Sequence, residues 1–429
     1  MSTKATLEET IDSKESDLIE LVTELVEAQT VTGNEKPGQA VVIDRLESIG
    51  YQPDVWEPSP DELTDHEGYF QTSSYDAVGY DGRPNVAVRI EGGDGPTLTL
   101  GGHIDVVDVT ESEWEREPWT VTQEGDTLYG RGVADMKGGL AAVLLAIEAL
   151  ENSGVELGGD LIFQSTIEEE DGGIGGALST LERGYVPDAA VIAEPFNIPN
   201  IGIASAGVMY FRVEVPGKSV HAAWGHQGVN AIGNATKIYH AIEELDQQRK
   251  AEIDYEPAYQ SDPDLEGNVT NINIGMIEAG DWPSTLPGKA ILQGRVGWPP
   301  GESRKDVREQ IESAIQEVAN DDPWLKDNQP LIEWFGWQAV PHEISPDAEI
   351  AQISKQNAER ITEQSGSFVG GNAALDERFY ALYYDINAVS VGPEGWNLHG
   401  ADEHTTVPAL LETAKTIAGI AVDYCGVDD

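Results

Sequence analysis

Apolar residues recur with two different spacings along this chain. In the first half, short apolar runs typical of buried strands alternate with helix-like apolar faces, which favours an α/β fold with a largely parallel sheet and helices on both sides. The predicted strands are residues 85–90, 97–100, 160–166 and 189–193, and the predicted helices are residues 16–30, 38–50 and 138–150. Residues 138–150 are apolar almost all round, so this helix should be buried. Residues 54–84 lack a clear pattern, and we expect a long ordered loop near the mouth of a site.

A different pattern begins after about residue 203. Alternating strands with helical stretches between them predict a separate α+β unit with a core of its own. Its predicted strands are residues 209–215, 269–277 and 290–296, and its predicted helices are residues 231–248 and 305–319. Beyond about residue 341 a helix, a strand and a helix follow. We therefore predict an α/β domain formed by residues 1–206 and 336–429, interrupted by an inserted α+β domain at 207–335.

Composition and charge exclude several classes of protein. Hydrophobic residues make up 40% of the chain, which excludes global disorder. No apolar run reaches about 18 residues, and the acidic N-terminal stretch does not resemble a signal peptide. The net charge of −52 disfavours nucleic acid and anionic membranes as partners. Scarce Lys and abundant acids resemble proteins of salt-loving microbes, so we expect folding to require molar salt.

The chain contains one cysteine, Cys425. A single cysteine precludes an intramolecular disulfide, which fits a reducing environment. We therefore expect a cytoplasmic location.

Five short motifs place His and carboxylate side chains at predicted ends of strands or helices. They contain His103 and Asp105 after the strand at 97–100, Asp135 among glycines before the buried helix, Glu168-Glu169-Glu170-Asp171 after the strand at 160–166, Glu194 after the strand at 189–193, and His399 near the C-terminus. Each motif alone has a structural interpretation: a His that ends a strand, an N-cap, or a solvated charged turn. Strand ends are also where α/β proteins place ligands, so together the motifs predict one site.

The same side chains predict a metal centre. Four consecutive acids at the end of a core strand repel one another unless a positive charge lies among them, and a divalent cation would supply it. Mixed His and carboxylate ligands suit zinc, with cobalt or manganese as alternatives. Two ions about 3.5–4 Å apart need a bridging carboxylate and further ligands for each ion. That requirement is met by His103, Asp135, Glu170, Glu194 and His399.

The motifs GHIDVV, GRGVADMKGG, EEEDGGIGG, AEP and LHGADE, in this order, resemble the co-catalytic zinc deacylase and peptidase family. Its members include acetylornithine deacetylase, succinyl-diaminopimelate desuccinylase, aminoacylase and glutamate carboxypeptidase. The resemblance implies a di-zinc hydrolase of linear amides. It also implies that the two α/β segments form the catalytic domain and that residues 207–335 form a lid and dimerisation domain.

The resemblance assigns a role to each candidate side chain. The family pattern Glu-Glu-x-Gly-x-x-Gly aligns with residues 169–175, which makes Glu169 the general base and Glu170 a metal ligand. The alternative register, with Glu168 as base and Glu169 as ligand, misplaces both glycines. The implied ligands of one zinc are His103, Asp135 and Glu194, and those of the other are Asp135, Glu170 and His399. Asp105 would orient His103, and the peptide bond after Asp135 would be cis.

The inserted segment carries further motifs of this family. His221, in Pro216-Gly217-Lys218-Ser219-Val220-His221-Ala222, resembles a lid His that reaches the active site of a partner subunit, which implies a homodimer and an oxyanion donor. Arg295 resembles an Arg that binds the substrate carboxylate. Gly371 and Asn372, with Asp376-x-Arg378 after them, resemble a substrate-binding turn. Ser284 stands where the family often has Asn, so the substrate stays open, and His404 is expected to be a bystander.

We therefore expect a metal-dependent enzyme that hydrolyses the amide bond of a small N-acylated amino acid, similar to acetylornithine deacetylase. The alternatives are a desuccinylase-like activity and a dipeptidase or carboxypeptidase activity. A non-catalytic zinc-binding protein is the alternative from another class. The presence of every implied ligand and of the base argues against it.

Overall fold

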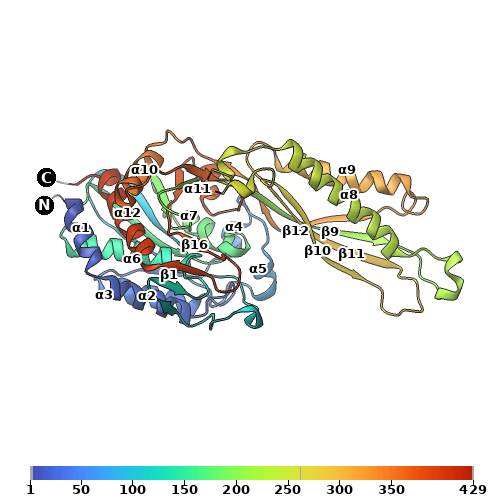
Figure 1. Cartoon of the computed structure of the whole chain (residues 1–429), viewed down its shortest axis with the longest axis horizontal. Helices are drawn as coiled ribbons and strands as arrows, with labels where there is room; N and C mark the ends of the chain where they lie inside the picture. Colours follow the sequence, from blue (N-terminus) through green and yellow to red (C-terminus); the bar gives the residue numbers. More distant parts are fainter. Residues whose placement is uncertain (1–2, 261, 428–429) are drawn as a thin grey trace. The chain divides into compact units, whose positions relative to one another are not determined.

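The computed structural model describes residues 3–260 and 262–427 (Figure 1). The chain forms two compact units. Unit 1 comprises Met1–Ala204, Glu343–Val369 and Leu375–Asp429, and unit 2 comprises Ser205–His342 and Gly370–Ala374. That residues 207–335 fold as an independent domain stays a prediction.

Unit 1 is built on a nine-stranded mixed sheet, which confirms the predicted α/β class. The strands follow the order β1 (Asp54–Trp56), β2 (Asn85–Ile90), β6 (Gly159–Thr166), β3 (Gly95–His103), β7 (Ala189–Ile192), β15 (Asn387–Ser390), β8 (Ile201–Ser205) and β13 (His342–Glu343), and β14 (Phe368–Gly370) pairs with β8. The central strands β6, β3, β7 and β15 are parallel, whereas β1 and β2 are antiparallel to their neighbours. The carboxyl ends of β6, β3 and β7 therefore meet at one edge.

Helices pack around this sheet. They are α1 (Thr3–Asp12), α2 (Glu15–Glu27), α3 (Lys36–Ser48), α4 (Pro60–Leu63), α5 (Ser73–Val78), α6 (Lys137–Asn152), α7 (Ser179–Glu182), α10 (Glu349–Thr362), α11 (Glu377–Tyr383) and α12 (Val407–Cys425). The helix α6 is buried along nearly its whole length, as its apolar sequence predicts, and packs with α12 against β3. The helix α1 was not predicted, because its apolar stripe consists of Leu7 and Ile11 alone.

A small four-stranded sheet lies beside the metal-ligand motifs. Its order is β16 (Gly395–Trp396), β17 (His404–Thr406), β5 (Thr127–Tyr129) and β4 (Thr122–Glu124). Strands of two or three residues carry no measurable period, so the sequence pattern could not reveal them. Their pairing brings the segment before Asp135 next to the segment that carries His399.

Unit 2 contains a four-stranded antiparallel sheet with helices along one side (Figure 1). The strand order is β10 (Asn271–Ala279), β11 (Lys289–Trp298), β9 (Gly207–Pro216) and β12 (Leu331–Ala339), and the helices are α8 (Ala231–Glu252) and α9 (Arg304–Asp321). The buried core lies between sheet and helices and includes Phe211, Ile238 and Ile311. Strand β12 was not predicted, and a register shift between Phe335 and Gln338 interrupts its alternation.

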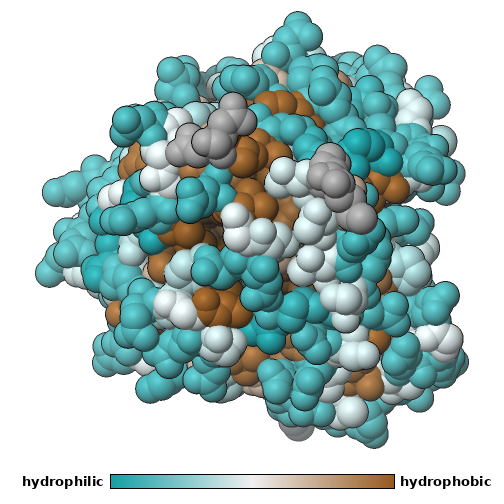
Figure 2. All heavy atoms as spheres, turned by 90° about the vertical axis from the view of Figure 1, so that its left-hand side faces the viewer, coloured by the Kyte–Doolittle hydropathy of each residue, from teal (hydrophilic) through white to brown (hydrophobic). Residues whose placement is uncertain are grey.

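The surface agrees with the strongly acidic composition. Figure 2 shows the face of unit 1 that carries the chain termini, where hydrophilic residues dominate and hydrophobic ones form small separate patches. Among the residues that the structure describes, no helix combines the length and the apolar character that a bilayer crossing requires.

Candidate metal centre

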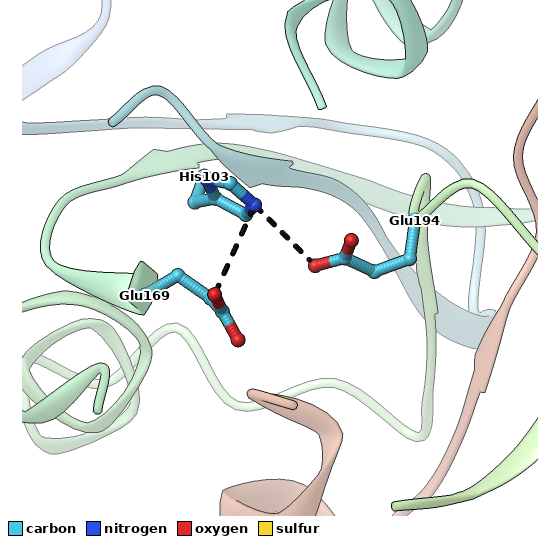
Figure 3. Close-up of side chains that lie close together, drawn as sticks. All are labelled: His103, Glu169 and Glu194. Carbon is cyan, nitrogen blue, oxygen red and sulfur yellow. Dashed lines mark ion pairs between the residues drawn. The ribbon is translucent and has the colours of Figure 1, made fainter. Parts of the chain in front are cut away.

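Two candidate ligands and the candidate base meet where parallel strands end (Figure 3). His103 is the last residue of β3, Glu169 begins a single helical turn after β6, and Glu194 follows β7. The Nε2 atom of His103 lies 3.6 Å from Oε1 of Glu194 and 3.9 Å from Oε2 of Glu169. Because the strands run in parallel, residues far apart in sequence converge here, as predicted for ligands at strand ends.

Asp135 lies between the two histidines. Its Oδ1 is 3.3 Å from Nε2 of His103, and its Oδ2 is 3.3 Å from Nε2 of His399. The Nε2 atom of His399 also lies 3.0 Å from Oε2 of Glu170. A carboxylate with one oxygen directed at each imidazole has the geometry that a bridging ligand would need. The peptide bond between Asp135 and Met136 is cis, as the resemblance implied.

Asp105 contacts both His103 and the turn that follows β6. The Nδ1 atom of His103 lies 2.8 Å from the backbone carbonyl oxygen of Asp105 and 3.6 Å from its carboxylate. The carboxylate instead accepts hydrogen bonds from the backbone N–H groups of Glu169 and Glu170 and from the hydroxyl of Thr32. Asp105 therefore fixes the turn that carries two other candidate residues.

The structure distinguishes the three consecutive glutamates. Glu168 is fully buried and accepts hydrogen bonds from the hydroxyls of Thr72, Ser74 and Tyr80 and from the backbone N–H of Gly175. Four donors therefore surround this carboxylate, and three of them belong to the 54–84 segment. The 54–84 segment was predicted as a long ordered loop, but it contains the strand β1 and the short helices α4 and α5.

The cluster fits divalent cations. Nε2 of His103 and one carboxylate oxygen each of Glu169, Glu170 and Glu194 are buried without a hydrogen-bond partner in the described part of the chain. Unpaired buried polar atoms are costly, and bound cations with their coordinated water would give these atoms partners. Nitrogen and carboxylate oxygen donors in this mixture suit zinc and its neighbours among the divalent metals.

The pKa shifts of the clustered side chains also favour bound cations. Burial raises the pKa of Glu194 well above the usual range. Burial lowers the pKa of His103, but Glu194 and Asp135 outweigh it and raise that pKa well above its usual value. Hydrogen bonds with Asp135 and Glu170 raise the pKa of His399 to about 10. Without cations these side chains favour their protonated forms, because the cluster holds more negative charge than its surroundings can balance.

Other predicted site residues lie in unit 2. His221 is exposed, and its Nδ1 accepts a hydrogen bond from the backbone N–H of Ala223. The backbone N–H of Ala222 donates to the carbonyl of Ser284. Arg295, on β11, donates to Oδ1 of Asn271 at 2.7 Å, and burial lowers its pKa.

The predicted substrate-binding turn divides between the units. Gly371 has a φ of +89°, and the ring of Tyr255 packs where a Cβ would stand, while Asn372 is exposed. Arg378, in unit 1, is fully buried and donates to the backbone carbonyls of Leu375 and Gly172. Its guanidinium thus supports the turn after Glu170.

Sequence reasoning missed Glu403 and Arg131. Both are buried, and NH1 of Arg131 donates to Oε2 of Glu403 at 2.6 Å. Both lie inside motifs that carried the resemblance, but no local pattern shows that these two motifs pair.

His404 stacks on Trp396 and tilts against Tyr129. It belongs to no candidate metal group among the described residues.

Comparisons with known proteins agree with this geometry. Residues 99–423 match the protein family described as "Peptidase family M20/M25/M40". The chain is 27% identical to an N-formyl-4-amino-5-aminomethyl-2-methylpyrimidine deformylase from Bacillus subtilis, over 98% of this chain and 97% of the relative. It is 28% identical to a succinyl-diaminopimelate desuccinylase from Methylobacterium radiotolerans, over 94% and 96%.

The fold is also shared with solved structures. An M20 family metallo-carboxypeptidase from Sulfolobus solfataricus superimposes with a TM-score of 0.74 at 16% identity, over 95% of this chain and 99% of that chain. The family match covers far more than half of the chain and includes every strand end at which the candidate ligands gather. The chain therefore belongs to peptidase family M20/M25/M40 and is a metal-dependent hydrolase that acts on amide bonds.

Proposed function

We propose that this enzyme removes the acyl group from a small N-acylated amine or amino acid. The observation that carries the proposal is the convergence of two imidazoles and four carboxylates. Three of these carboxylates retain a buried oxygen that has no hydrogen-bond partner within residues 3–260 and 262–427. The two curated relatives are a deformylase and a desuccinylase by name, which supports N-deacylation as the reaction. An N-acetylated amino acid, as in the acetylornithine deacetylase-like activity predicted from the sequence, is one candidate among such N-acylated substrates.

Two divalent ions, with zinc as the first candidate, would complete the site. We assign His103, Asp135 and Glu194 to one ion, and Asp135, Glu170 and His399 to the other. Bound ions of this kind lower the pKa of a coordinated water and polarise an acyl carbonyl. The shared carboxylate of Asp135, directed at both imidazoles, supports the pairing of the ions.

Glu169 is the proposed general base. Its carboxylate is almost fully buried, Oε1 has no hydrogen-bond partner among the described residues, and burial raises its pKa well above the usual range. A carboxylate in this position beside the proposed ions can take a proton from the attacking water and then pass it to the leaving amine. The backbone N–H of Glu169 is held by Asp105, which fixes the origin of the side chain.

His221 is the proposed donor to the oxyanion, supplied by a second copy of the chain. Because Nδ1 of His221 accepts a hydrogen bond, the ring proton lies on Nε2, and this tautomer can donate. Dimerisation through unit 2 is supported by the edge strand β10, on which Met276 and Ile277 are more than half exposed. Light scattering would test the dimer, and His221→Ala mixed with Glu169→Gln would test whether active sites are shared.

Arg295 is the proposed partner of a substrate carboxylate, and Gly371 with Asn372 would form the adjoining turn. A carboxylate is present in an N-acyl amino acid and also in a dipeptide, so dipeptidase or carboxypeptidase activity is the second candidate. A panel of formyl, acetyl and succinyl amides together with dipeptides, assayed with Zn²⁺, Co²⁺ or Mn²⁺, would separate the two. Turnover of dipeptides alone would overturn the deacylase proposal.

The acidic surface supports a further proposal, that the protein needs molar salt to stay folded. A net charge of −52 destabilises the folded chain by self-repulsion, which salt screens within about 3 Å at 1 M. Circular dichroism should show a melting temperature that falls as salt is removed. An unchanged melting curve would refute this requirement. A cytoplasmic location stays a prediction that rests on the single cysteine.

A further inference from the structure

Glu403 accepts more hydrogen bonds than any of the candidate metal ligands, and it belongs to no candidate metal group in the described part of the chain. It is fully buried, and its Oε1 accepts hydrogen bonds from the backbone N–H groups of Ala134 and Asp135, both at 3.0 Å. The backbone N–H of Gly132 donates to both carboxylate oxygens at 3.1 Å. A single side chain therefore holds the whole loop that leads into Asp135.

Arg131 connects Glu403 to the segment that carries His399. Its NH1 donates to Oε2 of Glu403 at 2.6 Å, and its NH2 donates to the backbone carbonyl of Gly400 at 3.1 Å. The backbone N–H of Gly130 donates to the backbone carbonyl of Glu403 at 3.0 Å. Gly400 directly follows His399, so the Arg131–Glu403 pair ties the Asp135 loop to the His399 loop.

The candidate ligands differ in what fixes them. His103 is part of β3, and Glu194 follows β7, so the central sheet holds both. Asp135 precedes α6 in a turn, and His399 has a φ of +61° between the short strands β16 and β17. Of the two proposed ion sites, the one that contains His399 therefore depends far more on loop geometry.

We propose that Glu403 and Arg131 are positioning residues that hold Asp135 and His399 at the spacing required by the second metal ion. The inference rests on the proposed two-ion function. It predicts an asymmetric defect. Loss of this clamp, the Glu403–Arg131 pair, should weaken the ion bound by His399 much more than the ion bound by His103 and Glu194, although Asp135 is a proposed ligand of both. Partners outside the ligand set typically change metal affinity by about 10–100-fold.

The test is the variant Glu403→Gln. The amide keeps the size of the side chain, but it replaces one acceptor oxygen with an NH₂ group that faces N–H donors. Metal-free protein would be titrated with Co²⁺, followed by calorimetry and by visible absorption. We expect two equivalents in the wild type. In the variant we expect one equivalent within about threefold of wild type and the other weakened about 10–100-fold.

A matched control separates this role from general destabilisation. Glu148 is a buried acid of α6 that pairs with Lys14 and Arg45, away from the metal centre. Glu148→Gln should lower the melting temperature of the metal-free protein but leave both Co²⁺ equivalents unchanged. His399→Ala identifies the second site, because the equivalent that it loses should be the one weakened in Glu403→Gln. If Glu403→Gln does not fold, Arg131→Lys, which keeps the charge, gives the same readout with a smaller loss.

The outcomes distinguish failure of the Glu403–Arg131 clamp from failure of the proposed two-ion function. Two wild-type equivalents, with both affinities unchanged or equally reduced in Glu403→Gln, would overturn the clamp and leave the proposed function intact. A similar loss in Glu148→Gln would also overturn it. A wild-type protein that bound a single equivalent would overturn the two-ion function, and the clamp as stated with it.

Discussion

Two groups of buried carboxylates lie within unit 1, and they differ in what surrounds their oxygens. The paired acids, Glu35, Glu168 and Glu403, accept hydrogen bonds from hydroxyls, guanidinium groups and backbone N–H groups of the protein. The open acids, Glu169, Glu170 and Glu194, each keep one buried oxygen without such a partner among the described residues. The difference shows that burial alone does not identify a candidate for the metal centre: its glutamates, Glu169, Glu170 and Glu194, are all open acids.

The contrast is sharpest between neighbours in the sequence. Glu168 and Glu169 are adjacent, yet Glu168 turns towards Thr72, Ser74 and Tyr80, and Glu169 turns towards His103. Glu168 adopts a left-handed backbone conformation with a φ of +66°, which sends the two side chains in different directions. One acid thus anchors the 54–84 segment while the next serves the proposed reaction.

The largest expected effect comes from Asp135→Asn, which removes the shared charge from the open cluster. We expect the metal content to fall from two ions to fewer than one per chain and activity to be lost, because both proposed ions use this carboxylate. Metal analysis after dialysis measures the first effect, and amide hydrolysis measures the second. Wild-type protein stripped by a chelator is the control and should have the same melting temperature as the stripped variant. Full metal content in the variant would contradict the bridging role.

The next largest effect is expected for Glu169→Gln. Removal of a general base should lower kcat by about 10²–10⁴-fold. The metal content should stay at two ions per chain, because this side chain is not one of the proposed ligands. Steady-state kinetics and metal analysis of the same preparation check both expectations. Loss of metal together with activity would place Glu169 among the ligands and restore the alternative register.

Substitution of a paired acid should act on stability instead. In Glu168→Gln, an amide NH₂ would face buried hydroxyl and N–H donors, so we expect a loss of about 1–3 kcal/mol in the free energy of unfolding. The metal content should not change. Urea unfolding of the metal-loaded protein, followed by circular dichroism, measures the loss. A variant with wild-type stability and no activity would show that Glu168 takes part in the reaction.

The smallest effect is expected for Tyr80→Phe, which removes one of the donors to Glu168. The hydroxyl of Tyr80 lies 3.0 Å from Oε2 of Glu168, and its loss should lower the free energy of unfolding by about 0.5–1.5 kcal/mol. Tyr51→Phe is the matched control, because its hydroxyl bonds to Glu151 in an exposed pair and its loss should matter less. Equal effects in the two variants would show that the contact with Glu168 is worth no more than a surface contact.

Most elements of the fold could be predicted from the sequence because their signals are local. The strands β2, β3, β6 and β7 and the helix α6 follow from apolar runs within each segment. The short strands β5, β16 and β17 could not be predicted, since they exist only through pairing with one another. The helix α1 carries too few apolar residues to stand out.

The sequence by itself determined which side chains are chemically able to hold a cation, and it placed them at the ends of core strands. Only the tertiary structure decided which acids are open and which are paired, because the side-chain donors to Glu168 lie 88–96 positions away and Arg131 lies 272 positions from Glu403. The physical reason is that hydrogen bonding and burial depend on distance in space. A local pattern records neither until the chain has brought those partners together.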